Sequence, residues 1–293
     1  MSAAAPTPAA AAPAAAPAAA PAVSARTVID GCFSADGRAP LATVYDVGLA
    51  VGLPEQTVRL AIRRMQAAGE LQQIGRGRAG TLERTPEGRA SAGREARLLE
   101  FAFAQDAGAA PWDGAWRLHA FTVPESRRTE RDALRSALTA LGAAPLAPGL
   151  YLSPHELREE LAHALSPATI AKRLLSATSR ELEVPGCADD SAIAEFLWPA
   201  APTRAAYAPL DRALASPGPR GDDPIELTAR AITLADALDR ALAEDPLLPL
   251  ELRAADWPPA RTRTAFLREW ESIEQRHPTL PVFSPSRGSA PFG

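Results

Sequence analysis

The stretch from Leu41 to Ala68 limits the possible folds more than any other part of the chain. Residues 41–50 make a short apolar segment, Val51-Gly52-Leu53 interrupts it, and a second segment then runs from Pro54 to Ala68 and stops at Gly69. Glycine adopts the backbone angles of a tight turn, and proline is tolerated in the first helical turn because its missing N–H has no partner there. The pattern predicts two helices joined by a three-residue turn.

The second predicted helix has two distinct faces. At 100° per residue, Val58, Ala61, Ile62 and Met65 fall within about 60° of one another, which predicts a buried stripe. The opposite face is polar and basic, and it collects Gln56, Arg59, Leu60, Arg63 and Ala67, with Arg64 at its edge. A slim basic helix face of this kind is typical of an element that enters a groove.

A hairpin with a basic tip is expected directly after this helix. Residues 71–74 and 79–84 are short strand-like runs on either side of Gly75-Arg76-Gly77-Arg78, and a further helix is expected from Thr85-Pro86 to about Ala107. The order helix, turn, helix, hairpin predicts a winged helix-turn-helix. A structural three-helix module with merely solvated arginines remains the alternative.

The major groove of DNA is about 12 Å wide and admits one helix, whose arginines can bond twice to guanine and whose glutamine can bond adenine. On that basis Gln56 is a candidate for adenine, Arg59 and Arg63 for guanine, and Leu60 for a thymine methyl group. Arg76 and Arg78 would meet phosphate or the minor groove. The full set of predicted DNA-binding residues is Gln56, Thr57, Arg59, Leu60, Arg63, Arg64, Arg76 and Arg78.

Charge separates the front of the chain from the rest. Residues 24–97 hold 11 Arg against 8 Asp plus Glu, whereas the whole chain has a formal charge of −4. Of the 31 basic residues only Lys172 is lysine, which reflects a GC-rich coding sequence more than a mechanism. A nucleic-acid contact is therefore expected near the front.

The middle of the chain alternates strands and helices. Strands are expected at 115–123, 146–152 and, as one or two short strands, within 174–184; helices are expected at 127–141 and from Ser153-Pro154 to Leu165. That order predicts a ferredoxin-like domain. From Asp190 onward only helices are expected, at 191–198, 203–215, 224–243 and 261–276.

The predicted fold class is therefore α+β and multidomain. The expected parts are a disordered Ala/Pro tail at 1–23, the winged domain with its following helix at 24–107, a ferredoxin-like dimerisation domain at 112–188, a helical domain at 190–277 and a disordered tail at 278–293. The first 23 residues contain 14 Ala and 5 Pro without a charge, and prolines at that density break helices, so they predict neither a signal peptide nor a membrane anchor.

Chemistry beyond binding has little support in the composition. Two cysteines, Cys32 and Cys187, cannot build a disulfide framework, which favours a cytoplasmic protein. The four histidines are scattered without carboxylates at metal-ligand spacing, so we expect no metal and no cofactor.

Six segments in chain order resemble the PaaX family of bacterial transcriptional repressors. They are GLPEQTVRLAIRRMQAAGEL (52–71), RTPEGR (84–89), WDGAW (112–116), VPESRRTERDALRSALTALG (123–142), LAPGLYLSP (146–154) and DPLLPLELRAADWP (245–258). The resemblance spans nearly everything between the two tails. It implies a winged helix-turn-helix, a ferredoxin-like middle domain and a helical back domain, in a homodimer that binds a palindromic operator.

The resemblance also implies an effector, because founding members of the family release DNA on binding phenylacetyl-CoA. An aryl- or acyl-CoA thioester is the expected class, and Arg127, Arg128 and Arg131 are the residues that could hold its phosphates. A solvated surface helix paired with Glu125 and Glu130 is the plainer interpretation of these arginines.

The middle domain also resembles small CRISPR-associated proteins of spacer acquisition, some of which are nucleases. Those carry an aspartate at the end of the first strand, whereas this chain has Phe121-Thr122-Val123-Pro124 there and reaches a carboxylate only at Glu125. We therefore expect no enzyme activity. A metal-dependent nuclease using Glu125 is the alternative, as is an architectural DNA-binding protein without an effector.

Overall fold

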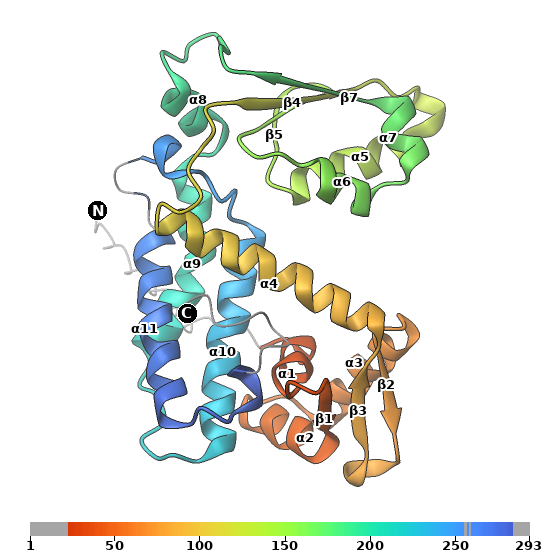
Figure 1. The fold of residues 1–293 in the computed structure, drawn as a ribbon, viewed down its shortest axis with the longest axis vertical. Coiled ribbons are helices and arrows are strands. Elements are labelled where there is room, and N and C mark those ends of the chain that lie inside the picture. The colour runs from red at the N-terminus through yellow and green to blue at the C-terminus, as the bar shows by residue number, and fades with distance from the viewer. Residues whose placement is uncertain (1–22, 255–256, 258, 284–293) are drawn as a thin grey trace, which may run out of the picture.

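The computed structural model describes residues 23–254, 257 and 259–283, which form a mixed α+β chain of eleven α-helices and two small sheets. Figure 1 shows a lower part, built from the front and back of the chain, and an upper part built from its middle. The long helix α4 (Pro86–Asp106) crosses the lower part and leads towards the upper one. In the described part of the chain, no helix has the length and apolar character needed to cross a membrane.

The first sheet belongs to the front of the chain, which we call the head (residues 23–85). Its helices are α1 (Ala25–Gly31), α2 (Leu41–Ala50) and α3 (Glu55–Ala67). Its strands are β1 (Arg38–Pro40), β2 (Leu71–Ile74) and β3 (Thr81–Arg84), antiparallel in the order β1-β3-β2. The predicted hairpin is confirmed, with a 3-10 turn at Gly77–Ala79. Strand β1 was not expected, since three residues show no periodicity.

The turn between α2 and α3 has the expected causes. Gly52 lies at φ 82°, and Pro54 is the N-cap of α3 rather than its first helical residue. In the predicted stripe Val58, Ile62 and Met65 are buried, and Ala61 is half-buried. Helices α2 and α3 pack closely at Gly48. A Cβ added there would lie only 3.0 Å from Val58 Cγ2, so glycine permits this approach.

The second sheet belongs to the middle of the chain. Its strands are β4 (Trp116–Phe121), β5 (Ala144–Ala147), β6 (Leu150–Ser153) and β7 (Leu174–Ser179), and its helices are α5 (Arg128–Ala140), α6 (Arg158–Ala164) and α7 (Pro167–Arg173), with a 3-10 turn at Glu125–Arg127. The strands run antiparallel in the order β5-β6-β4-β7. This is the order of a ferredoxin-like domain, as predicted for this segment.

Two details of the predicted middle domain were wrong. The single strand expected at 146–152 is a hairpin, β5 and β6, which turns at Pro148-Gly149. Gly149 has φ 77° and a Cβ there would lie 2.7 Å from the Phe121 carbonyl oxygen, so the turn needs glycine. The helix expected from Ser153 to Leu165 begins only at Arg158, and α7 was not expected.

The back of the chain is helical. It contains α8 (Asp190–Leu197), α9 (Ala200–Ala215), α10 (Pro224–Ala243) and α11 (Pro259–Arg276), with 3-10 turns at Leu250–Leu252 and Pro281–Phe283. Residues 278–283 differ from the expected disordered tail, because Leu280 and Val282 are buried. The remaining expected tail residues, 1–22 and 284–293, lie outside the described part of the chain.

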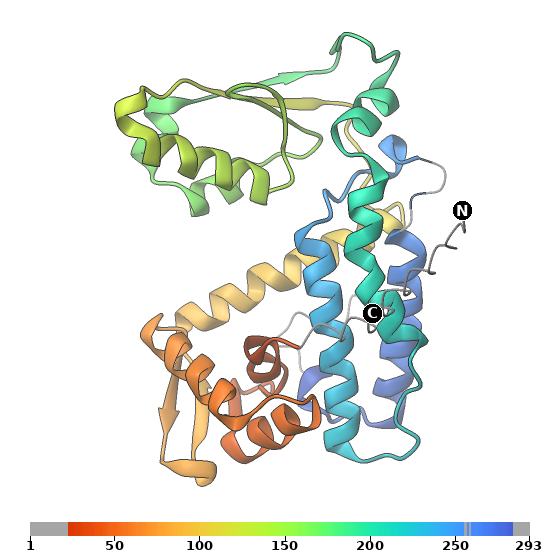
Figure 2. The ribbon, with the colours of Figure 1, turned by 180° about the vertical axis from the view of Figure 1, so that it is seen from behind.

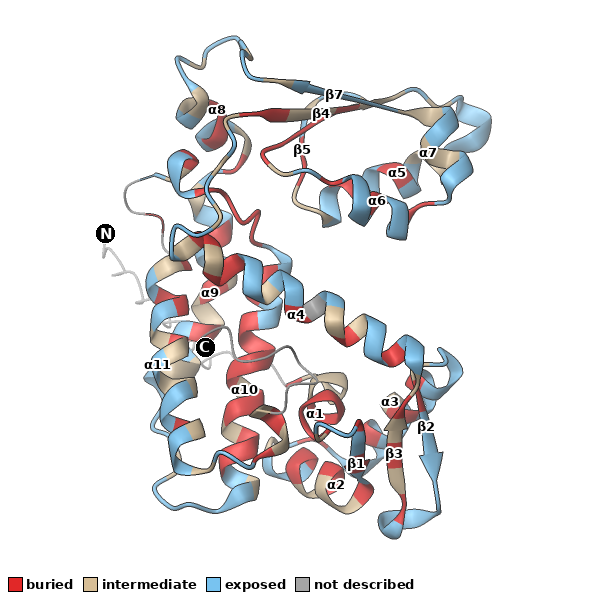
Figure 3. Cartoon of the chain, viewed as in Figure 1, coloured by how far each residue is buried: buried red, intermediate tan, exposed pale blue. Residues whose placement is uncertain are grey.

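One hydrophobic core joins the head to the back of the chain (Figure 3). It contains Val28 and Val44 of the head together with Leu227 and Leu234 of α10. Asp236 of α10 also accepts hydrogen bonds from the Ser24 backbone N–H, at 2.8 Å, and from the Thr27 hydroxyl, at 2.9 Å. The sheet of the middle domain packs in two separate clusters.

Candidate nucleic-acid interface

The predicted DNA-binding residues belong to α3 and to the β2–β3 hairpin, whose ribbons lie beside each other in Figure 2. All of them are exposed: Gln56, Thr57, Arg59, Leu60, Arg63, Arg64, Arg76 and Arg78. Helix α3 exposes them because the opposite stripe is fixed in the core by Val58, Ile62 and Met65.

Tyr45 of α2 links α3 to the tip of the hairpin. The guanidinium carbons of Arg59 and Arg78 lie 5.9 and 5.7 Å from the centre of its ring, at cation–π distance. The sequence analysis did not single out Tyr45. The sequence shows only an aromatic residue on the helix that precedes the basic face. Its contact with the hairpin depends on the folded structure and could not be predicted.

Two carboxylates hold the same pair of arginines. Glu55 accepts from Arg59 at 2.5 Å and lies 3.8 Å from Arg78, and Asp46 of α2 forms an ion pair with Arg78. Contact with Tyr45, and then the charge of Glu55, raises the pKa of the Arg59 guanidinium. Arg59 and Arg78 are therefore oriented before any ligand arrives.

The other three arginines have no such partner. Within the described ranges, Arg63, Arg64 and Arg76 form no ion pair, so their charges face solvent. A shallow depression of about 340 Å³ separates α3 from the hairpin, with Arg59, Arg63, Gln66, Gln73 and Gly77 on its walls. The hollow therefore has an oriented guanidinium group, Arg59, a solvent-facing one, Arg63, and the amides of Gln66 and Gln73 around it, which suits phosphates and base edges.

Apolar side chains complete this surface. Leu60 is 45% exposed in the middle of the α3 face and Ile74 is 51% exposed at the end of β2. Nearly half of the Leu60 side chain is thus left open to solvent between arginines. It can supply the apolar contact that a thymine methyl group offers.

The arginines predicted for an effector lie elsewhere, at the start of α5. Each is held by a carboxylate of the same segment: Arg127 by Glu130 at 2.7 Å, Arg128 by Asp132 at 3.5 Å and Arg131 by Glu125 at 2.7 Å. All three arginines therefore lie in surface ion pairs, two of them with Glu125 and Glu130 as in the plainer interpretation and that of Arg128 with Asp132. Glu125, the carboxylate of the nuclease alternative, is engaged by Arg131.

Metal-ligating side chains are not gathered anywhere in the described residues. No three histidine, cysteine, aspartate or glutamate side chains there are placed to hold one ion.

Comparison with known proteins finds a family match for the middle of the chain. Residues 109–192 match the family model described as the PaaX protein central Cas2-like domain. Among solved structures, an uncharacterized protein from Mycobacterium tuberculosis, Rv0674, is similar at 20% identity with a TM-score of 0.52, over 87% of this chain and 97% of that one. None of the curated proteins compared with the chain matches it.

The structural likeness covers nearly the whole length of both proteins, so it shows a shared fold from the head to the back helices. The family match falls on the segment that holds the second sheet. The resemblance stated from the sequence is thereby confirmed at these residues: the chain carries the central domain of the PaaX family.

Proposed function

We propose that this protein is a DNA-binding transcriptional regulator of the PaaX type, which reads DNA with α3 and grips it with the β2–β3 hairpin as a wing. The observation that carries the proposal is the exposed basic surface formed by α3 and the hairpin around Tyr45. The PaaX central domain supports it, because that family consists of transcriptional regulators.

The dimensions of the head fit this role. Helix α3 has 13 residues, and an α-helix with its side chains is about 10–12 Å across, which matches a major groove about 12 Å wide. In this proposal Gln56, Thr57, Arg59, Leu60, Arg63 and Arg64 face base edges and nearby phosphates. Arg76 and Arg78 contact the backbone beside the groove.

A homodimeric repressor on a palindromic operator is the arrangement we propose for the whole protein. Two heads related by a two-fold axis would meet half-sites one helical turn, or a multiple of it, apart. The central domain would pair the protomers, the cytoplasm would be the place of action, and an acyl- or aryl-CoA thioester remains the effector class implied by the family resemblance.

No observation favours the nuclease alternative over this proposal. Glu125 lies in an exposed ion pair with Arg131, and none of the other described carboxylates joins it in a metal-binding group. An architectural protein without an effector differs from the proposal only in lacking a ligand response.

The test compares two arginines of the interface. Arg63→Ala is expected to lower the affinity for the operator by roughly 1 to 3 kcal/mol and to relax the base preference, because Arg63 has no internal partner and faces the groove. Arg78→Ala is expected to weaken binding to all sequences alike and to reduce the salt slope by about 1, because it contacts phosphate. Arg135→Ala, an exposed arginine of α5, is the matched control.

Binding isotherms at several salt concentrations, on operator and random duplexes, measure both effects. The operator itself is sought by footprinting the DNA upstream of the protein's own gene at low salt. Absence of any protected segment, or equal losses for Arg63→Ala and Arg135→Ala, would overturn the proposed function.

A further inference from the structure

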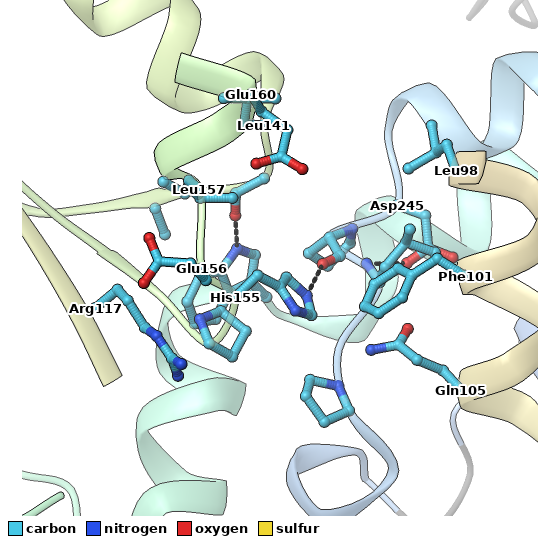
Figure 4. A pocket seen from close by; sticks show the side chains of 18 of the residues that line it. Leu98, Phe101, Gln105, Arg117, Leu141, His155, Glu156, Leu157, Glu160 and Asp245 are labelled. Atoms are coloured by element: carbon cyan, nitrogen blue, oxygen red, sulfur yellow. Dashed lines mark hydrogen bonds between the residues drawn. The ribbon is translucent and has the colours of Figure 1, made fainter. Parts of the chain in front are cut away.

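A cavity of about 680 Å³ lies where the middle domain meets α4 and the segment 244–249. This volume is in the range of small-molecule sites. Figure 4 shows its two sides: Arg117, His155 and Glu156 come from the middle domain, and Leu98, Phe101 and Gln105 come from the second half of α4. His155 and Glu156 thus face residues of α4 that lie about 50 positions earlier in the chain.

Aromatic and aliphatic side chains dominate the walls. The Phe101 ring meets the His155 ring edge-on, with centroids 5.4 Å apart, and Trp198 lines the far side with its indole N–H donated to the Gly142 carbonyl at 2.9 Å. Leu98 and Phe101 nevertheless remain 47% and 36% exposed. An apolar surface left open inside a concave site favours a ring-bearing ligand.

Gln105 supplies a specific polar contact. It is only 1% exposed, and its side-chain oxygen Oε1 is buried without a hydrogen-bond partner. Figure 4 shows its amide directed from α4 into the cavity. A buried acceptor without a partner is unfavourable, and a ligand N–H or O–H would satisfy it.

The charges of the lining select against anions. Five carboxylate side chains and one arginine line the cavity. Arg117 is occupied by Asp113, at 2.5 Å, and Asp245 is neutralised by Arg263, at 2.7 Å. The exposed side chains of Glu160 and Glu244, together with Glu156, which lies 4.0 Å from Arg158, form an acidic rim. A polyphosphate such as that of coenzyme A would be repelled there.

We propose that this cavity binds a small aromatic compound, uncharged or singly cationic, whose N–H or O–H donates to Gln105 Oε1. The ring lies against Phe101 and the surrounding aliphatic side chains, and a cationic group faces the acidic rim. This site takes a different ligand class from the thioester that the family resemblance implies.

Helix α4 connects the cavity to the head. Only Thr85 separates the end of β3 from Pro86, the first residue of α4. At the other end of the helix, Asp106 forms ion pairs with Arg253 at 2.7 Å and with Arg263 at 2.6 Å. A ligand against Leu98, Phe101 and Gln105 therefore contacts the helix that leaves the head. We infer that occupancy changes the affinity for DNA; this second step rests on the proposed function, whereas ligand binding does not.

The binding test uses the full chain and calorimetry with three probes, phenol, tyramine and benzamide, and with phenylacetyl-CoA as the polyanionic comparison. At least one ring probe is expected to bind, and phenylacetyl-CoA is expected to bind this cavity more weakly. Gln105→Leu keeps the side-chain size and removes the acceptor, so the affinity should fall on the order of tenfold. Gln275→Leu, the same change on exposed Gln275 of α11, should leave it unchanged.

A rim variant keeps the test decisive if Gln105→Leu does not fold. Glu160 is exposed, and Glu160→Lys should weaken tyramine binding more than phenol binding, since only tyramine is cationic. Failure of all three ring probes, or binding of phenylacetyl-CoA that Gln105→Leu abolishes, would overturn the site.

Operator affinity measured with and without the bound probe tests the second step. A change in affinity supports coupling through α4, and an unchanged affinity overturns it. A protein that binds the ring but no DNA supports the site and overturns the proposed function.

Discussion

At the residue scale, Arg263 is the most deeply buried charge among the described residues. Its side chain is 0% exposed and donates to Asp106 at 2.6 Å, to Asp245 at 2.7 Å and to the Tyr207 hydroxyl at 2.6 Å. Burial alone would raise the pKa of Asp106, but hydrogen bonds from Arg263 and Arg253 outweigh it and hold that pKa below its ordinary value of 3.8. The network fixes the end of α4 to α9 and α11.

Replacing Arg263 by methionine should be strongly destabilising. The change leaves Asp245 buried without its cation, and breaking a buried pair in this way costs about 3 to 5 kcal/mol. Arg276→Met removes an exposed pair with Asp222 and should cost no more than about 1 kcal/mol. Urea denaturation of both variants gives the two free energies of unfolding, and equal losses would contradict the structural role of the network.

Two histidines make the stability depend on pH. His119 is 2% exposed and lies 3.0 Å from the Ser176 hydroxyl, and His155 lines the cavity; burial lowers the pKa of both below 6.5. Below pH 6.5 the unfolded chain takes up protons that the folded chain does not, so the free energy of unfolding should fall from pH 7.5 to pH 5.5. The free energy of unfolding that is lost on acidification should be fully regained above pH 7.

The urea midpoint measured across this range checks the expectation. The double variant His119→Gln, His155→Gln should show a smaller decline between pH 7.5 and 5.5 than the parent protein. A decline of the same size in both would assign the pH dependence to other groups.

At the element scale, α4 connects the head to the rest of the molecule, and two of its glycines have opposite surroundings. A Cβ on Gly88 would lie 2.0 Å from the Glu70 carbonyl oxygen, so the start of α4 touches the backbone between α3 and β2. A Cβ on Gly93, by contrast, would meet only the end of the Arg97 side chain at 3.7 Å. The same substitution therefore has opposite expected effects on one helix.

Gly88→Ala should destabilise the protein by about 1 to 3 kcal/mol because the backbones must move apart. Gly93→Ala should stabilise it by roughly 0.5 to 1 kcal/mol because alanine is the better helix former. Thermal unfolding of the two variants shows the sign directly. Stabilisation by Gly88→Ala would mean that α4 does not pack against Glu70.

Local patterns in the sequence were sufficient for the elements that carry the proposed DNA contact. The α3 stripe and its termini follow from residues 52–69 alone, and the hairpin follows from Gly75 and Gly77. Strand β1 could not be recognised in the same way, because it has three residues and its partner β3 lies far along the chain. The β5–β6 hairpin is local, but its two short strands and the Pro148-Gly149 turn fit within one apolar run, which was interpreted as a single strand. The cavity was missed because nothing local in the sequence brings Gln105 and His155 together.

At the scale of the whole molecule, the head is not packed as an independent unit. Its core continues into α10, and Asp236 holds both the Ser24 backbone and the Thr27 hydroxyl. The domain boundaries expected at 107 and 190 remain predictions. The packing shows that the expected winged domain (24–107) and the expected helical domain (190–277) share one core. Of the two clusters in the middle domain, one lies entirely within it, whereas the other joins Trp116 and Leu152 of the sheet to Ile193 of α8 and to Leu248 and Leu252 of the back segment.

Hydrogen exchange should show this shared core. Amides of α1, α2 and α10 are expected to exchange as one cooperative unit, and those of β4 as another, since local opening follows packing. Asp236→Ala should accelerate exchange in α1 and leave β4 unchanged. Exchange of α1 at least tenfold faster than α10 in the parent protein would contradict a shared core.

The bond between Ser24 and Asp236 spans 212 positions of the sequence. A ribosome adds about 5 to 20 residues per second, so roughly 10 to 40 s separate the synthesis of these two residues. For most of that interval the head has been synthesised but lacks α10, the helix that completes its core. The core of the head therefore stays incomplete in a nascent chain until α10 (Pro224–Ala243) has been synthesised.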